Sequence, residues 1–274
     1  MEIIQETAEI AQWMYRKGWD ERNGGNISVW LTEADCPQAA GEQALRSWQM
    51  EVQDRKLWGA RFLVTGSGKY FRKIQGDEEK NLGIVRIAEG GERLELLWGL
   101  ADGGAPTSEL ATHLRCHAVR RRADPAHRVI MHCHPEHLIA MSYVHSLDER
   151  ELTRSLWRMG TECLVVFPEG IGALPWMVCG GEEIARASAE KMADCRLLLW
   201  AHHGVFGAGE TLDETYGLIE TAEKAAEIYL KIAPFEVLQT ITDEKLAVLG
   251  EAFGVCPRAG YLEEAEEELQ RAMG

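Results

Sequence analysis

Short apolar stretches alternate with amphipathic ones along almost the whole chain, and this alternation limits the folds that the chain can adopt. Stretches typical of buried strands lie at 27–31, 61–65, 83–88, 93–98, 128–134, 163–167 and 196–200. Helical patterns lie at 5–17, 106–121, 135–144, 149–159, 181–193 and 212–232. Elements that alternate in this way predict an α/β, or α+β-like, fold in which helices pack on a sheet. The chain has no internal repeat and no linker rich in Pro or Ser, so we expect a single domain over residues 1–274.

The helix at 212–232 has the strongest local signals. Thr211 and Glu214 have the spacing of a capping box, and an apolar stripe follows at helical spacing. Residues 36–59, by contrast, have little pattern and predict a long excursion. Residues 261–272 could form a very acidic amphipathic helix, and we expect its charges to form a solvated surface.

The charge balance and the cysteines narrow the class of protein. Asp and Glu number 44 against 29 Lys and Arg, a net charge of −15 that disfavours nucleic acid and anionic membrane surfaces as partners. No apolar run approaches the length of about 20 residues that spans a bilayer, and the N-terminus lacks the features of a signal peptide. The seven cysteines form no CxxC pair, which favours a reduced, cytoplasmic protein over a disulfide scaffold.

Two groups of histidines are candidates for a metal site. His132 and His134 share one face of a predicted strand, while Cys133 faces the other way and is expected to be a small buried residue. His202 and His203 follow another predicted strand, and only one of these neighbours is expected to bind, since adjacent residues of an extended chain point in opposite directions. Three neutral imidazoles around a zinc ion leave a coordination position open for a substrate. The alternative is that these are ordinary, partly buried histidines.

Two glycine-containing turns and a helix start could together hold an anion. Asn23-Gly24-Gly25-Asn26 precedes a strand and Thr65-Gly66-Ser67-Gly68-Lys69 follows one, so both could offer backbone amides and polar side chains. Thr107 and Ser108 lie at a predicted helix N-terminus, which also favours anions. The spacing matches neither a P-loop nor a dinucleotide-binding turn, and each turn alone could be structural.

Three carboxylates could carry out acid–base chemistry. Glu109, beside the helix start, could be a general acid/base or only a first-turn residue that favours the helix dipole. Glu162 and Glu169 flank the predicted strand at 163–167, and the same two interpretations stay open for them.

Longer motifs resemble those of a known family. In chain order they are Trp19-Asp-Glu-Arg-Asn-Gly-Gly-Asn26, Val64-Thr-Gly-Ser-Gly-Lys69, Asn81-Leu-Gly-Ile-Val85, Pro106-Thr-Ser-Glu-Leu110, Val129-Ile-Met-His-Cys-His134, Thr161-Glu-Cys-Leu-Val-Val-Phe-Pro168, Leu174-Pro-Trp-Met-Val178, His203-Gly-Val-Phe206 and Thr211-Leu-Asp-Glu-Thr215. They resemble the L-rhamnulose-1-phosphate aldolase family, which consists of class II, zinc-dependent aldolases related to L-fuculose-phosphate aldolase and L-ribulose-5-phosphate 4-epimerase. The resemblance runs from about residue 11 to 255 and does not cover 36–59 or 261–274.

This resemblance implies a central, mostly antiparallel sheet covered by helices and a fourfold-symmetric homotetramer with sites at subunit interfaces. It implies one Zn²⁺ per subunit on His132, His134 and His203, with Glu109 as the catalytic acid/base. His202 is a departure, since the family commonly has another residue type there. Residues implied to bind the substrate phosphate, in turns that Gly66 also shapes, are Asn23, Gly25, Asn26, Ser67, Gly68, Thr107 and Ser108. Glu162 matches a second catalytic carboxylate that the family places near a neighbouring subunit's site.

The implied activity is the reversible cleavage of L-rhamnulose 1-phosphate to dihydroxyacetone phosphate and L-lactaldehyde in L-rhamnose catabolism. Zinc would act as a Lewis acid toward the enediolate, and Glu109 would protonate the enediolate carbon. Two alternatives stay open. One is a related aldolase or 4-epimerase on the same scaffold, and the other is a zinc-binding interaction protein without turnover.

Overall fold

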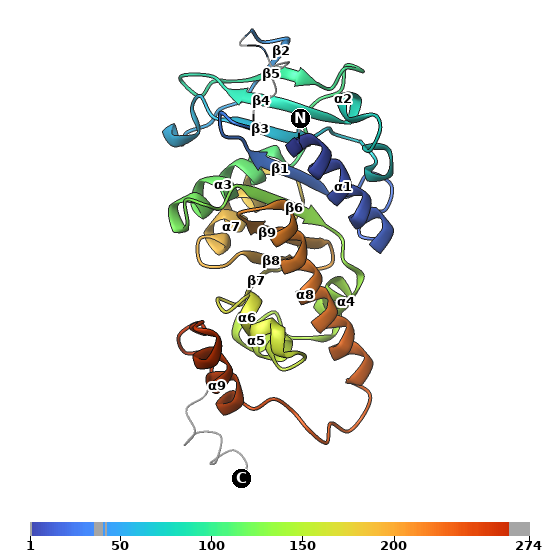
Figure 1. Cartoon of the computed structure of the whole chain (residues 1–274), viewed down its shortest axis with the longest axis vertical. Coiled ribbons are helices and arrows are strands. Elements are labelled where there is room, and N and C mark those ends of the chain that lie inside the picture. Colours follow the sequence, from blue (N-terminus) through green and yellow to red (C-terminus); the bar gives the residue numbers. More distant parts are fainter. Residues whose placement is uncertain (1, 36–40, 42, 263–274) are drawn as a thin grey trace.

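The backbone forms one mixed sheet whose strands lie side by side along the long axis of the molecule (Figure 1). The computed structural model describes residues 2–35, 41 and 43–262, and this part of the chain contains a nine-stranded sheet. Its spatial order is β2 (Arg46–Gln49), β5 (Arg93–Gly99), β4 (Leu82–Ile87), β3 (Arg61–Thr65), β1 (Asn26–Trp30), β6 (Val129–Cys133), β9 (Gly204–Gly209), β8 (Leu197–Trp200) and β7 (Ile171–Leu174). Neighbouring strands are antiparallel except for the parallel pair β7 and β8, which confirms the mostly antiparallel sheet implied by the resemblance.

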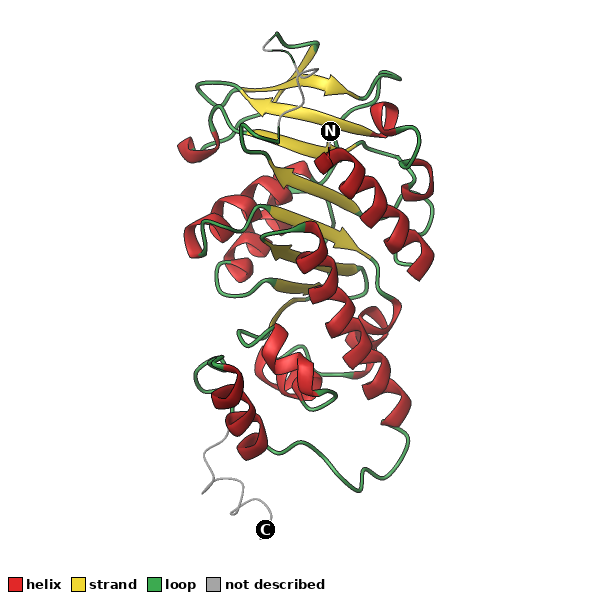
Figure 2. Cartoon of the chain, viewed as in Figure 1, coloured by secondary structure: helices red, strands yellow, loops and turns green. Residues whose placement is uncertain are grey.

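Helices cover both faces of this sheet (Figure 2). The α-helices are α1 (Glu2–Lys17), α2 (Glu78–Asn81), α3 (Leu110–Ala123), α4 (Glu136–Val144), α5 (Glu149–Trp157), α6 (Thr161–Val166), α7 (Glu182–Met192), α8 (Leu212–Ile232) and α9 (Asp243–Phe253), and two 3₁₀ turns are η1 (Arg55–Leu57) and η2 (Phe71–Lys73). Helices α1 and α8 contact each other on one face, and α3 packs against α7 on the other. The mixed helix–sheet fold predicted from the alternating pattern is therefore confirmed.

The central strand β6 shows how the sequence builds these two layers. Met131 and Cys133 belong to the large core that includes side chains of α1 and α8. Ile130, on the opposite side of the strand, packs with Cys116 of α3 and Met192 of α7. Successive side chains of a strand point to opposite faces, so His132 lies on the same side as Ile130, and its ring stacks on Phe206 at 4.5 Å between centroids. The strand thus presents His132 to the layer of α3.

Several predicted elements differ from the structure. The stretch at 163–167 was expected to be a strand, but α6 covers Thr161–Val166. Its β-branched residues favour a strand locally, yet the segment closes a helical turn over Trp157, whose Nε1 donates to the Phe167 carbonyl (3.0 Å). Helix α3 begins at Leu110, later than the predicted start at 106, with Glu109 at its N-cap.

The sequence patterns also missed some elements. Strand β2 lies within the segment at 36–59, and β7, β9 and α9 had no counterpart among the predicted elements. The predicted acidic helix at 261–272 lies outside the described residues beyond Leu262.

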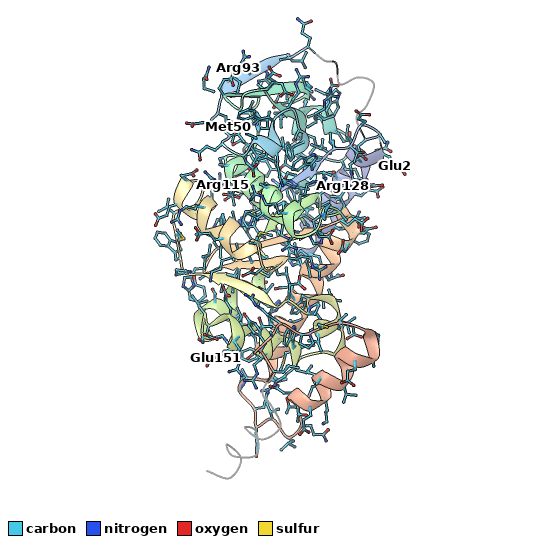
Figure 3. The ribbon with its side chains drawn as sticks, turned by 90° about the vertical axis from the view of Figure 1, so that its left-hand side faces the viewer. Glu2, Met50, Arg93, Arg115, Arg128 and Glu151 are labelled. Carbon is cyan, nitrogen blue, oxygen red and sulfur yellow. The ribbon has the colours of Figure 1, made fainter. Side chains whose placement is uncertain are left out.

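The two ends of the sheet are far apart in the molecule. In the side view of Figure 3, Met50 and Arg93 lie near one end, and Glu151 of α5 lies toward the other. Within the described residues, we find no helix with both the length and the apolar character needed to cross a bilayer. The middle of the sheet, where β1, β6 and β9 adjoin, carries the residues considered next.

Candidate metal and phosphate site

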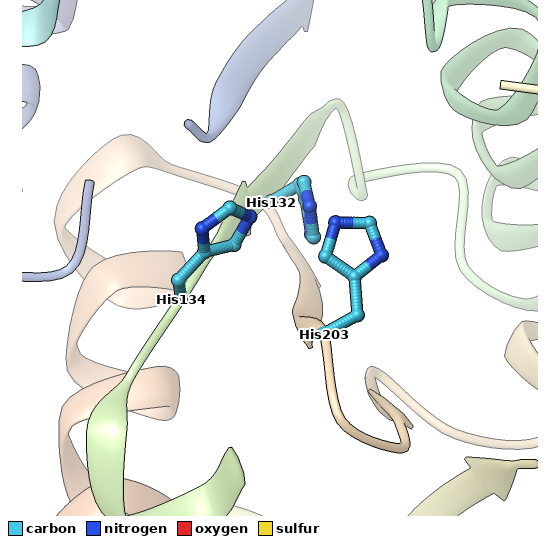
Figure 4. A group of neighbouring side chains, drawn as sticks. All are labelled: His132, His134 and His203. Carbon is cyan, nitrogen blue, oxygen red and sulfur yellow. The ribbon is translucent and has the colours of Figure 1, made fainter. Parts of the chain in front are cut away.

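Three histidines from neighbouring strands face one another (Figure 4). His132 lies in β6, His134 follows that strand, and His203 directly precedes β9. One potential ligand atom of each lies within 4.8 Å of the others, and the ring centroids are 5.0–5.1 Å apart. His202 adopts a left-handed backbone conformation (φ 62°) and contacts Ser142 of α4 instead. Of the two adjacent histidines, therefore, only His203 reaches the group.

Hydrogen bonds orient two of these rings. The Val205 carbonyl lies 3.1 Å from His132 Nδ1 and can only accept, so it favours a proton on Nδ1 and leaves Nε2 free. His134 Nδ1 lies 2.9 Å from both oxygens of the Glu21 carboxylate, and its Nε2 is buried without a hydrogen-bond partner. Metal-binding histidines are typically held in this way by a carboxylate or carbonyl on the other ring nitrogen. The donor set therefore fits a divalent metal ion.

Burial keeps the imidazoles of His132 and His203 in the form that can bind a metal. It lowers the pKa of His203 to about 4 and that of His132 well below its ordinary value. Both rings are therefore neutral near pH 7, and neutral imidazole is the metal-binding form.

Two glycines allow the backbone to approach the histidine cluster closely. A Cβ atom at Gly24 would lie 2.7 Å from the His134 ring, and one at Gly204 would lie 2.4 Å from the Cys133 carbonyl oxygen. A Cβ at Gly204 would also meet the His132 ring at 2.9 Å. Larger residues at either position would push the rings out of their present arrangement.

The turns that the sequence singled out adjoin the same cluster. A bridge between Gly66 and Pro106 joins the turn after β3 to the segment before α3, and Thr107 N donates to the Thr65 carbonyl (3.0 Å). Together with the turn before β1, these segments enclose a cavity of about 170 Å³. The expected phosphate residues that line it are Asn23, Gly25, Asn26, Ser67, Gly68, Thr107 and Ser108, and the three histidines line it too. Segments far apart in the sequence thus meet at one place.

Glu109 is a buried carboxylate on the wall of this cavity. Its side-chain Oε2 accepts a hydrogen bond from Asn26 Nδ2 (2.8 Å) and lies 3.7 Å from His132 Nε2. Burial raises its pKa above the ordinary value, while the bond from Asn26 opposes this change. A buried carboxyl group with a raised pKa, held 3.7 Å from a histidine of the cluster, is suited to accept and donate protons.

The other two candidate carboxylates lie elsewhere. Glu162 is exposed at the start of α6, where it lines a separate hollow of about 620 Å³ together with Lys17 and His137. Glu169 forms an ion pair with Arg196 at 2.6 Å. Within this chain, therefore, neither is brought to the cavity with the histidines.

The structure adds three residues that the sequence patterns did not single out. Glu21 contacts His134, and His113 contacts Asn26. The sulfur of Cys179 lies within 4.8 Å of ligand atoms of Glu109 and His203. His113 could have been found because it lies four residues after Glu109, one helical turn away. Cys179 has no local signal, since a loop brings it to the site.

Comparisons with known proteins agree with this architecture. Residues 5–230 match the family model described as the class II aldolase and adducin N-terminal domain. A rhamnulose-1-phosphate aldolase from Listeria monocytogenes is 52% identical over 262 residues, which cover 95% of this chain and 96% of that protein. A protein of the same name from Enterococcus faecalis is 52% identical over 264 residues, covering 96% and 95%. The solved structure of a sugar-phosphate aldolase from Thermotoga maritima has a TM-score of 0.74 at 29% identity and covers 87% of this chain and 97% of its own.

Proposed function

The chain belongs to the family of class II aldolase and adducin N-terminal domains, and we propose that it cleaves L-rhamnulose 1-phosphate reversibly to dihydroxyacetone phosphate and L-lactaldehyde in L-rhamnose catabolism. The observation that carries the proposal is one cavity lined by three histidines, one buried carboxylate, two polar turns and the segment before α3. The choice of substrate rests on the two relatives named above, which are 52% identical to this chain over 95% and 96% of its length.

The metal of the proposal is one Zn²⁺ per subunit, held by His132, His134 and His203. Three neutral nitrogen donors suit zinc, and the buried, unpartnered Nε2 of His134 supports a ligand at this point. When bound, the ion would act as a Lewis acid that stabilises the negative charge left on the three-carbon fragment by cleavage.

Glu109 is the proposed acid/base. Cleavage turns the C4 hydroxyl into the aldehyde carbonyl and releases the hydroxyl proton to solvent. After the C3–C4 bond breaks, the carboxyl group of Glu109 donates a proton to C3 and so completes dihydroxyacetone phosphate. In the direction of synthesis, the carboxylate removes that proton. Both tasks require a carboxyl group that exchanges a proton during turnover, and burial, which raises the pKa of Glu109, favours the protonated form that donates.

The substrate phosphate is proposed to lie on the turns, with Asn23, Gly25, Asn26, Ser67, Gly68, Thr107 and Ser108 around it. Helix α3 begins next to Thr107 and Ser108, and its N-terminal end adds a favourable field for an anion. Hydroxyl and amide groups of these turns can replace the water molecules around a phosphate.

Glu162 is proposed to act at a neighbouring subunit's site, since it lies outside the cavity of its own chain. This role requires the fourfold-symmetric homotetramer that the resemblance implies. We further propose that the protein is cytoplasmic and that residues 1–274 work as one aldolase-type domain, which the continuous sheet supports.

The decisive experiment measures release of dihydroxyacetone phosphate from L-rhamnulose 1-phosphate before and after chelator treatment, and again after zinc is restored. We expect zinc-dependent cleavage that is faster than with L-fuculose 1-phosphate. His134→Ala should lose both zinc and turnover, whereas Glu109→Ala should keep zinc and lose turnover. Epimerisation of a pentulose 5-phosphate instead of cleavage would favour a related activity. Zinc binding without turnover on any of these substrates would favour an interaction protein.

A further inference from the structure

A line of buried polar side chains leads from the cavity into the layer between the sheet and α3. Glu109 contacts Asn26, Asn26 contacts His113, His113 contacts Ser28, and Ser28 contacts His117. Asn26 and Ser28 come from β1, and both histidines come from α3. His113 and Ser28 are fully buried, so water does not compete for these contacts.

We propose that His113 is a positioning residue for Glu109, which acts by orienting the Asn26 amide so that its nitrogen donates to the Glu109 carboxylate. This inference rests on the proposed aldolase function. His113 does not line the cavity, so it acts through Asn26 and not on the substrate.

The chemistry of the donors and acceptors fixes the direction of the first two hydrogen bonds. In its ionised form, which is the form that removes the C3 proton, the Glu109 carboxylate only accepts, so Asn26 must turn Nδ2 toward Glu109 (2.8 Å). Asn26 Oδ1 then faces His113 Nε2, and because this oxygen only accepts, His113 must carry its proton on Nε2. Burial lowers the pKa of His113 to about 3, so the ring is neutral and Nδ1 has no proton.

The same direction continues to the end of the line. His113 Nδ1 accepts from the Ser28 hydroxyl (2.7 Å), and the Ser28 oxygen accepts from His117 Nε2 (2.8 Å). Burial lowers the pKa of His117 well below its ordinary value, so this ring is neutral and the order leaves its Nδ1 without a proton. His117 Nδ1 is also the side-chain atom of the line that is buried without a hydrogen-bond partner. The order of the hydrogen bonds thus requires an unprotonated Nδ1 on His117, and a buried Nδ1 without a hydrogen-bond partner is what the structure has at this position.

As a consequence, one oxygen of the Glu109 carboxylate is held in a fixed position by Asn26. With the proton of His113 on Nε2, the Asn26 amide cannot rotate without placing two acceptors, or two donors, against each other. Oε2 of Glu109 is therefore held by Asn26, and Oε1 is left for proton transfer. Without the donor at His113, the amide of Asn26 could turn its oxygen toward Glu109 and displace the carboxylate.

A matched pair of variants separates this role from general packing. In His113→Gln, the side-chain nitrogen can take the place of Nε2 and still donate to Asn26. In His113→Asn, the shorter amide reaches only as far as Nδ1 and loses that bond. The probe is exchange of a C3 proton of dihydroxyacetone phosphate with deuterated solvent by the zinc-loaded enzyme, a partial reaction that needs Glu109 but no aldehyde.

We expect His113→Asn to slow the exchange by about 10- to 100-fold, as small displacements of catalytic groups do, with zinc content and KM close to native. His113→Gln should restore most of the rate. His127→Gln, which removes another buried histidine outside the line, controls for general damage and should keep the native rate. Equal losses in the Gln and Asn variants, or native rates in both, would overturn the positioning role.

Neutron diffraction of the deuterium-exchanged native protein gives a readout that is independent of activity. We expect a deuteron on Nε2 of His113 and none on Nδ1, and the opposite result would overturn the proposal even if the variants fail to fold. If the native protein itself does not exchange dihydroxyacetone phosphate, the aldolase function fails, and the neutron result alone then decides the hydrogen-bond order.

Discussion

Replacement of Glu21 by Ala tests whether the histidine cluster is built to hold a metal. Both oxygens of the Glu21 carboxylate lie 2.9 Å from His134 Nδ1, which keeps the proton on that nitrogen and turns Nε2 toward the cluster. Loss of such an outer carboxylate weakens metal binding by about 10- to 100-fold, or about 1.4–2.7 kcal/mol. The Glu21 side chain is 69% exposed, so water screens its charge and can accept part of its hydrogen bond. We therefore expect the lower value, about tenfold.

The assay is competition for zinc between the protein and a chromophoric chelator at pH 7. Glu21→Gln keeps an acceptor oxygen but removes the charge, so its zinc affinity should lie between those of the native protein and Glu21→Ala. Glu220→Gln removes an exposed carboxylate that pairs with Lys17, away from the cluster, and should leave the affinity unchanged. An unchanged affinity in Glu21→Ala would refute the argument that this carboxylate holds a metal ligand in place.

Three further changes test other parts of the structure. Gly204→Ala should reduce bound zinc after dialysis, because its Cβ would lie 2.4 Å from the Cys133 carbonyl oxygen and displace the adjacent ligands; native zinc content would contradict this. Burial raises the pKa of Asp20 to about 7, so the folded state holds one more proton than the unfolded state between about pH 4 and 7. The free energy of unfolding of the native protein should therefore fall as the pH rises through this range, by at most about 1.4 kcal/mol per pH unit. Urea titrations of Asp20→Asn across this range should show a flatter dependence, and an equal slope would be the contrary result. Thr211→Ala removes the N-cap of α8 and should lower the free energy of unfolding, measured by urea titration, by about 1 kcal/mol. Thr221→Ala, within the same helix, should lower it by less, and equal losses would contradict the role of the cap.

Local periodicity was enough to predict part of the site. His132 lies in β6, and His134 directly follows that strand two residues later, so their shared face follows from the geometry of an extended chain. The motifs also pointed to the turns that line the cavity, because such turns depend on glycine and small polar residues near one another in the sequence.

Contacts between distant segments could not be predicted in this way. Glu21 and His134 are 113 residues apart, and Asn26 and His113 are 87 apart, so only the assembled sheet brings them together. Strand β9 was missed for a related reason. Glycines weaken the signal for a strand, yet Gly207 is needed where the Ile219 side chain of α8 would lie 2.8 Å from an added Cβ.

The net charge of the chain disfavours anionic partners, whereas the cavity is suited to a phosphate, and the structure shows how one molecule can have both properties. Among the described residues, the cavity is lined by no Lys or Arg, and Lys69 of the turn after β3 forms an ion pair with Asp102. A phosphate in this cavity would therefore be bound by hydroxyls, amides and the field of α3, all of which act over short distances. A net charge of −15 repels an extended polyanion such as nucleic acid, whose many phosphates cannot all reach such groups. It has far less effect on one phosphate enclosed by a site whose neutral donors replace its water, so the acidic composition excludes a class of partner without excluding an anionic substrate.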